Sequence, residues 1–100
     1  MDKMNIGILG TGHIGKTLAR KLSAAGHDVK VANSRGPETI EDDVLALGAR
    51  AVSTAQAVED VDVVILSIPL NRIPTIAPLI ANLPAETVVI DTSNYRKFWV

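Results

Sequence analysis

A glycine-rich segment near the start of the chain has residue types and spacing suited to holding an anion. Its spacing is G-x-G-x-x-G, in the residues Gly10-Thr11-Gly12-His13-Ile14-Gly15. Gly10 would permit a tight turn, Gly12 would let the backbone approach a pyrophosphate, and Gly15 would let a helix pack closely on a strand. Because the N–H groups at the start of that helix lack partners and carry partial positive charge, the segment predicts a dinucleotide-binding turn.

The remaining residues of this turn have predicted roles as well. We expect the backbone amides of Thr11, His13 and Ile14 to face the pyrophosphate, with the Thr11 hydroxyl as an extra donor. The His13 side chain has two interpretations: a solvent-facing residue in the first helical turn, or a contact to phosphate or nicotinamide. No second His, Cys or carboxylate stands at ligand spacing from His13, so the sequence predicts no metal site.

The residues that would meet the adenine ribose lie about 20 residues past the glycine turn, at the end of a second apolar run. An Asp or Glu usually stands there in NAD-binding domains, whereas this chain has Asn33, Ser34 and Arg35. No carboxylate at this place repels a 2′-phosphate, and the planar guanidinium of Arg35 matches phosphate oxygens. These residues predict NADP(H) as the cofactor. The alternative is that Arg35 only begins a solvated loop.

Strands and helices that alternate along the chain must position these residues. Apolar runs rich in β-branched residues indicate strands, and apolar residues at helical spacing indicate helices. Gly26 and Gly48 are expected to close two helices, and Pro78 to kink or delay the last one. Ser53 and Gln56 have the spacing of a capping box, which predicts the start of a short helix. The strands are predicted at residues 4–9, 29–32, 49–52, 61–68 and 87–91, and the helices at 14–25, 36–48, 53–59 and 73–83.

This alternation predicts the α/β fold class. We expect a Rossmann-type, doubly wound parallel sheet of five strands in the order 3-2-1-4-5, with helices on both faces. The chain has 100 residues, of which 47% are hydrophobic and 21% charged. That length and composition predict a single NADP-binding domain over residues 1–100.

Charge and hydropathy exclude several classes of partner. The net charge is −1, so no basic surface is predicted to bind nucleic acid or an acidic membrane. The longest apolar run, residues 63–66, is too short to span a bilayer, and the N-terminus lacks the apolar region of a signal peptide. We therefore expect a cytoplasmic protein whose partner is a small-molecule cofactor.

Four segments together resemble the deazaflavin (coenzyme F-420)-dependent NADP oxidoreductase family, whose members move a hydride between NADP(H) and the deazaflavin. The segments are ILGTGHIG (8–15), NSRGP (33–37), VILSIP (64–69) and VIDTSN (89–94). The resemblance covers the chain to about residue 94, and NSRGP is its most specific part. It implies an NADP(H)-dependent oxidoreductase with a deazaflavin- or flavin-like hydride acceptor.

The resemblance also implies roles for individual residues. The amides of the glycine turn would hold the pyrophosphate, and Ser34 and Arg35 the 2′-phosphate. Ile68 and Pro69 would lie beside the cofactor, and Ser67 would border the same place. Hydride transfer between two ring cofactors needs little side-chain chemistry, so we predict no catalytic acid or base.

Two other functions stay open. One is a non-catalytic NADP(H)-binding module, and the other is a reductase that uses the same half-domain on imines or hydroxy acids. Members of the family continue through further strands and helices, whereas this sequence ends with the apolar residues 98–100. We expect a truncated domain that keeps the NADP(H) site, with its aromatic tail docked on the sheet edge or, in a homodimer, on another subunit.

Overall fold

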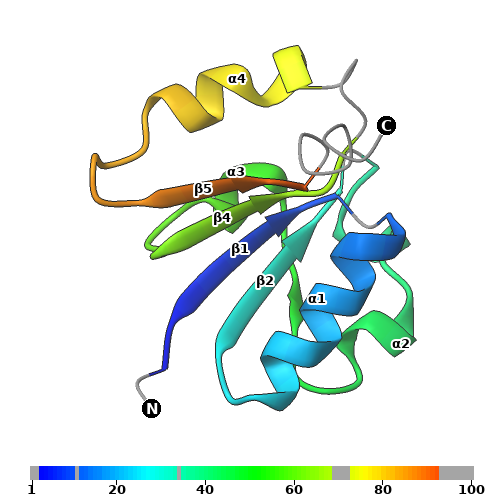
Figure 1. The fold of residues 1–100 in the computed structure, drawn as a ribbon. Helices are drawn as coiled ribbons and strands as arrows, with labels where there is room; N and C mark the ends of the chain where they lie inside the picture. Colours follow the sequence, from blue (N-terminus) through cyan, green and yellow to red (C-terminus); the bar gives the residue numbers. More distant parts are fainter. Residues whose placement is uncertain (1–2, 11, 34, 69–72, 93–100) are drawn as a thin grey trace, which may run out of the picture.

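The fold is an α/β sandwich built on one five-stranded sheet (Figure 1). A computed structural model describes residues 3–10, 12–33, 35–68 and 73–92, and for residues 73–76 it describes the backbone alone. The strands are β1 (Asn5–Leu9), β2 (Asp28–Ala32), β3 (Arg50–Ala51), β4 (Val63–Leu66) and β5 (Val88–Asp91). The helices are α1 (His13–Ala24), the 3-10 helix η1 (Pro37–Thr39), α2 (Asp42–Leu45), α3 (Thr54–Ala57) and α4 (Ile73–Ala81).

The strand order is β3-β2-β1-β4-β5 and every pairing is parallel, which confirms the predicted Rossmann-type topology. The register aligns the carboxyl ends of three strands: Leu9 of β1 pairs with Ala32 of β2 and with Leu66 of β4. The turns that follow these strands therefore meet at one edge of the sheet. In open parallel sheets, ligands bind outside this edge, where the strand order reverses.

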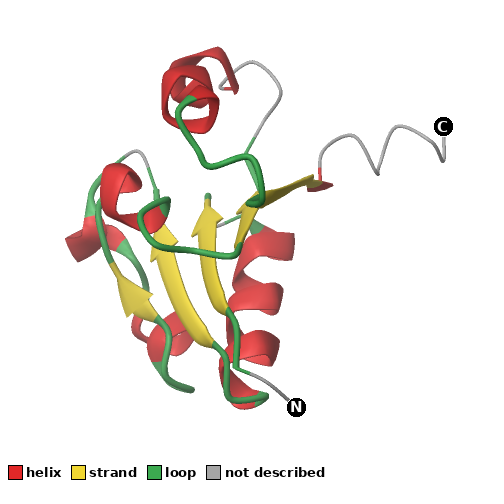
Figure 2. Ribbon diagram, turned by 90° about the vertical axis from the view of Figure 1, so that its left-hand side faces the viewer, coloured by secondary structure: helices red, strands yellow, loops and turns green. Residues whose placement is uncertain are grey.

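Side chains that alternate along the strands build two cores, one on each face of the sheet. Ile8, Val31 and Ile65 lie in the cluster that contains Ala19 of α1 and Val44 of α2. The next residue of each of these strands points to the other face, where Leu9, Ala32 and Leu66 cluster with Ala57 of α3. Figure 2 shows helices on both sides of the strands, as expected for a parallel sheet buried on both faces.

The helix predicted over 36–48 is wrong as a continuous element. The structure has the short helix η1, then Ile40 and Glu41 in extended conformations, then the four-residue helix α2. Ile40 is buried in the same core cluster as Val44. The extended backbone at Ile40 turns its side chain into the core. Core packing therefore overrides the helical pattern of the segment.

The structure bears on two predictions about where helices begin, at α3 and at α4. The capping box predicted at the start of α3 is confirmed: Ser53 Oγ accepts from Gln56 N at 3.2 Å, and Gln56 Oε1 accepts from Ser53 N at 3.1 Å. Pro78 does not delay α4, which begins at Ile73 and continues through Pro78 to Ala81.

Gly7 in the middle of β1 lets α3 approach the sheet. A Cβ on Gly7 would lie 1.8 Å from the backbone oxygen of Ala57. Real side chains do not tolerate that contact, so the distance between α3 and β1 depends on the missing side chain. This close approach fixes the second core directly behind β1.

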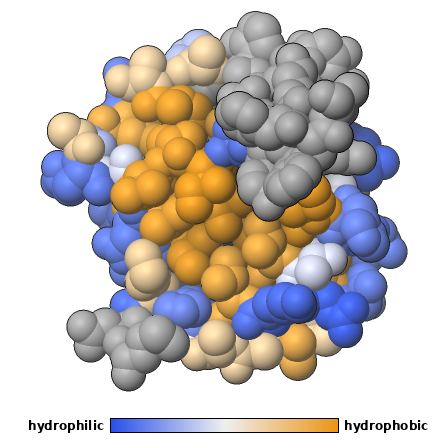
Figure 3. Space-filling view, in the orientation of Figure 1, coloured by the Kyte–Doolittle hydropathy of each residue, from blue (hydrophilic) through white to orange (hydrophobic). Residues whose placement is uncertain are grey.

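The edge strand β5 keeps apolar side chains exposed. Val88 is 53% exposed and Ile90 46%, and they pair with Val63 and Ile65 of β4 on the face that carries α1. Figure 3 shows a broad apolar area on this face of the molecule. The predicted docking of the tail falls on residues 93–100, which lie outside the described part. Among the described helices, none is long and apolar enough to cross a membrane.

Candidate nucleotide-binding site

The candidate site lies at the carboxyl edge of the sheet, where β1 turns into α1. Gly10 N donates to Ala32 O at 2.7 Å, and Ser67 N donates to Leu9 O at 2.8 Å. These bonds extend the pairing of β1 with β2 and β4 by one residue on each side. The glycine turn is therefore held between the ends of β2 and β4, at the point where the strand order reverses.

Two of the three glycines are required by the contacts that the turn makes with itself and with β4. Gly10 has φ +103°, and a Cβ there would lie 2.1 Å from Ser67 O. A Cβ on Gly15 would lie 2.5 Å from Gly10 O. A side chain at either position would push α1 away from the strands, which agrees with the packing roles predicted from the spacing.

Gly12 differs from the other two because a Cβ there would meet only ordinary van der Waals contacts among the described residues. The nearest atom to a Cβ on Gly12, among the described residues, is Ser67 O at 3.7 Å, and its φ of −66° is open to any residue. Protein packing therefore does not require a glycine here. The space left beside its backbone is where a phosphate group could approach the main chain.

Gly12 is also the N-cap of α1, a helix of 12 residues for which the described part of the chain provides no side-chain cap. The N–H groups in the first turn of a helix have no acceptor within the helix. In α1 this turn consists of His13, Ile14 and Gly15 and holds no acidic residue. A negative charge that balances the helix dipole would have to come from a bound anion. Uncapped N–H groups beside an open glycine fit a bound pyrophosphate. Thr11 lies outside the described residues.

Ser67 and Ile68 support the glycine turn from β4. Ser67 Oγ would lie 3.0 Å from a Cβ on Gly15, and Ile68 Cγ2 would lie 2.6 Å from a Cβ on Gly10. Both residues are half-buried. The structure thus brings these two predicted residues to the glycine turn, and their contact with a cofactor stays a prediction. Pro69 lies outside the described residues.

The loop after β2 is held by a hydrogen-bond network centred on Asn33. Its Oδ1 accepts from Arg35 N at 3.0 Å, and its Nδ2 donates to Thr39 Oγ1 at 2.9 Å. The Thr39 hydroxyl lies 2.7 Å from Gly36 O, to which it can donate. Asn33 therefore shapes the loop that presents Arg35, and Thr39 is a supporting residue that the sequence reasoning missed. The sequence signal that could have identified Thr39 is a hydroxyl residue three positions after Gly36, a spacing at which Thr side chains bind the backbone of a turn.

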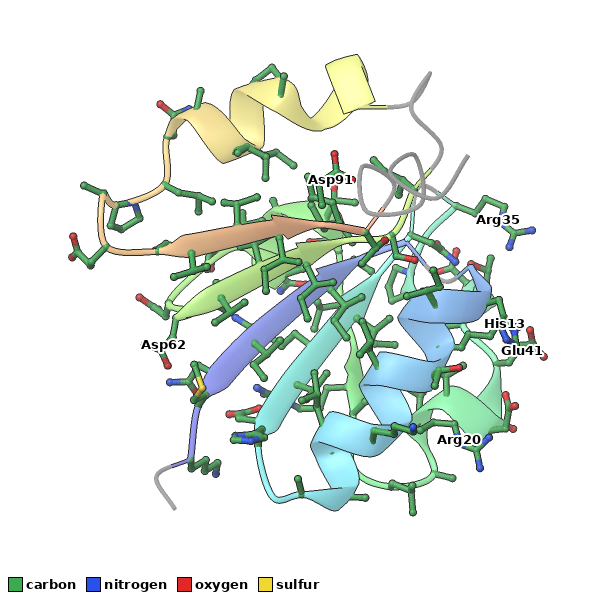
Figure 4. All side chains as sticks on the ribbon, in the orientation of Figure 1. His13, Arg20, Arg35, Glu41, Asp62 and Asp91 are labelled. Carbon is green, nitrogen blue, oxygen red and sulfur yellow. The ribbon has the colours of Figure 1, made fainter. Side chains whose placement is uncertain are left out.

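Arg35 and His13 are exposed on the same side of the molecule (Figure 4). The Arg35 side chain extends from the loop after β2, and that of His13 extends from the first turn of α1. The exposed His13 side chain is compatible with both interpretations of this residue. Its backbone oxygen accepts from the Thr17 hydroxyl at 3.0 Å. Ser34, between Asn33 and Arg35, lies outside the described residues.

An ion pair that the sequence did not reveal lies beside this loop. Lys16 of α1 donates from Nζ to Oε1 of Glu41, which precedes α2. This hydrogen bond raises the pKa of Lys16, burial lowers it, and the charges of Glu41 and Asp43 raise it further. The positive charge of Arg35 lowers the same pKa. Arg35 and Glu41, the partner of Lys16, lie on the same side of the molecule (Figure 4). No metal-binding cluster of His, Cys, Asp or Glu occurs within the described residues.

Solved structures of dehydrogenases and reductases share this fold. The chain is similar to 3-hydroxyisobutyrate dehydrogenase from Mycobacterium tuberculosis, with 29% identity and a TM-score of 0.73. It is also similar to a glyoxylate reductase from Paecilomyes thermophila (27%, 0.69) and, in fold alone, to D-lactate dehydrogenase from Escherichia coli (22%, 0.72). These matches cover 90%, 89% and 90% of this chain but only 31%, 27% and 29% of the respective structures.

The chain also matches a protein family over almost its full length. The family is described as "NADP oxidoreductase coenzyme F420-dependent", and its match covers residues 5–95. The chain therefore belongs to this family, which confirms the resemblance seen in the sequence motifs.

Alanine substitutions should separate the three glycines of the turn. Gly10→Ala and Gly15→Ala would each press a Cβ onto a backbone oxygen, so we expect each to lower the free energy of unfolding by about 2–4 kcal/mol. Gly12→Ala is the matched control and should cost about 1 kcal/mol or less. Urea denaturation followed by circular dichroism measures all three. Equal losses would contradict the distinction between packing glycines and the open glycine.

Proposed function

We propose that this member of the family is an NADP(H)-dependent oxidoreductase that moves a hydride between NADPH and a deazaflavin- or flavin-like acceptor. The observation that carries the proposal is the exposed Gly12, where packing against the described residues does not require a glycine. It directly precedes helix α1, for which the described residues provide no side-chain cap. The family match and the fold shared with dehydrogenases support it. A pyrophosphate at this turn would be held by main-chain N–H groups.

The preference for NADP(H) rests on the loop after β2. The strand ends at Ala32 and is followed by Asn33, whose amide binds the loop itself. The exposed guanidinium of Arg35 then supplies the positive charge that a 2′-phosphate requires. Because a charge-assisted hydrogen bond contributes about 1.5–3 kcal/mol, Arg35 alone would give roughly a ten- to hundredfold preference for NADPH over NADH.

The chemistry assigned to the chain's own residues is positioning. The nicotinamide cofactor, when bound, supplies or accepts the hydride. The glycine turn would anchor the cofactor at its pyrophosphate, Arg35 at its adenosine end, and Ile68 would border the crevice beside β4. At the end of β5, the Thr92 hydroxyl donates to Leu66 O at 2.7 Å and ties that strand end to β4. This arrangement holds a donor carbon in place without a catalytic acid or base.

A second candidate function is an NADP(H)-binding module without turnover. The chain spans only about 30% of the length of the solved dehydrogenases that it matches, as their coverage of 27–31% shows. Binding of the cofactor would be the same in both cases. The two functions differ in whether a hydride acceptor is reduced.

The first prediction concerns the cofactor. Arg35→Ala should weaken NADPH binding roughly ten- to hundredfold and change NADH binding by less than about twofold, because only NADPH carries the 2′-phosphate. Isothermal titration calorimetry with both nucleotides checks this. Arg20→Ala removes the same charge from an exposed site farther along α1 (Figure 4) and should leave both affinities unchanged. Unchanged discrimination in Arg35→Ala would contradict the assignment.

The second prediction concerns the reaction. With NADPH in excess, the chain should reduce a deazaflavin or a flavin. The reaction is measured under anaerobic conditions as the loss of the absorbance of the reduced nicotinamide. A quinone serves as the acceptor outside the proposed class. NADPH binding without reduction of any of these acceptors would favour the non-catalytic module.

A further inference from the structure

The ion pair between Lys16 and Glu41 lies where two parts of the candidate site meet. Lys16 is three residues beyond His13 on α1, so the two side chains share the face of the helix next to the glycine turn. Glu41 closes the loop that begins at Asn33 and carries Arg35. The pair therefore links the helix that would hold the pyrophosphate to the loop that would hold the 2′-phosphate.

The two partners have opposite effects on an anion bound beside them. Lys16 and Arg35 add positive charge, whereas Glu41 and Asp43 add negative charge. The charges of Arg35, Glu41 and Asp43 all affect the pKa of Lys16. The hydrogen bond to Glu41 is the largest of these influences. As long as Lys16 stays on Glu41, much of its charge is neutralised.

The pair is also exposed enough to exchange partners. The side chain of Lys16 is 35% exposed and that of Glu41 is 62% exposed. Exposed ion pairs contribute little to stability, because solvent and salt screen the two charges. A phosphate dianion with several acceptor oxygens is a stronger partner for an ammonium group than a single solvated carboxylate.

We propose that Lys16 exchanges Glu41 for the 2′-phosphate of NADP(H), so that this ion pair sets the strength of NADP(H) discrimination together with Arg35. Lys16 is then a specificity-determining residue, and Glu41 competes with the 2′-phosphate for its ammonium group. The inference rests on the proposed NADP(H) function, and it names a residue on α1 that the ribose-binding loop does not contain.

Glu41 can be altered without removing a structural contact at the start of α2. It is the N-cap of that helix, but its side chain makes no capping hydrogen bond. Glu41→Gln keeps the size of the side chain and removes the charge. Asp42→Asn removes the same charge from the next, exposed residue and serves as the matched control. For Lys16→Met, the control is Lys21→Met in the last turn of the same helix.

The experiment compares two probes that differ only in the 2′-phosphate: 2′,5′-ADP and 5′-AMP. Titration calorimetry should show that Lys16→Met weakens 2′,5′-ADP binding about five- to tenfold and that Glu41→Gln strengthens it about threefold. Binding of 5′-AMP should change by less than about twofold in either variant, because a hydroxyl offers no charge to Lys16. The Lys16→Met loss should be larger when Glu41 is already Gln, since no competitor then remains.

The controls separate this inference from general electrostatics and from the proposed function. Asp42→Asn and Lys21→Met should shift both probes by less than about twofold. Equal effects of Lys16→Met on both probes, or an effect of Glu41→Gln no larger than that of Asp42→Asn, would overturn the role of the pair while Arg35→Ala still weakens 2′,5′-ADP binding. Absence of binding of either probe to the unaltered chain would instead overturn the proposed function, and this inference with it.

Discussion

The close contact between the glycine turn and the end of β4 is the constraint on which the candidate site depends. Gly10 and Gly15 leave no room for a side chain, because backbone oxygens occupy the space that a Cβ would need. This contact aims the start of α1 at the carboxyl edge of the sheet. Gly12, the glycine of this turn at which a Cβ would clash with none of the described residues, is exposed at the start of the helix. The fit to an anion therefore depends on the missing side chains at Gly10 and Gly15 as well as on the N–H groups at the start of α1.

Most of the fold was predictable because local and global signals agree. Alternating strands and helices specify a parallel sheet with right-handed crossovers, and the glycine-rich turn after the first strand favours the Rossmann strand order. The capping box at Ser53 and the packing roles of Gly10 and Gly15 were predictable for the same reason, since each is a short-range pattern with one physical meaning. The segment after Gly36 was not predictable. Ile40 follows the helical pattern, but burial in the core holds its backbone extended and divides the helix.

The polar contacts of the site were harder to predict, because they join residues that are distant in the sequence. The contact expected between Asn33 and the cofactor stays a prediction, whereas the bonds of its amide to Thr39 and to the backbone of Arg35 were not predicted. Lys16 and Glu41 are 25 residues apart and meet only because α1 and α2 pack on the same face. No spacing rule in a single sequence reveals such a pair. The charge near the ribose site is therefore a property of helix packing as well as of the loop after β2.

The central claim is that main-chain N–H groups at the start of α1 hold the pyrophosphate of a nicotinamide dinucleotide. Its most direct test is a titration of the ¹⁵N-labelled protein with NADPH, followed by two-dimensional NMR of the backbone amides. The account predicts that the amide signals of Gly12, His13 and Ile14 shift with saturation, and that inorganic pyrophosphate shifts the same signals. Saturable shifts confined to other parts of the chain, with these three amides unmoved, would contradict it.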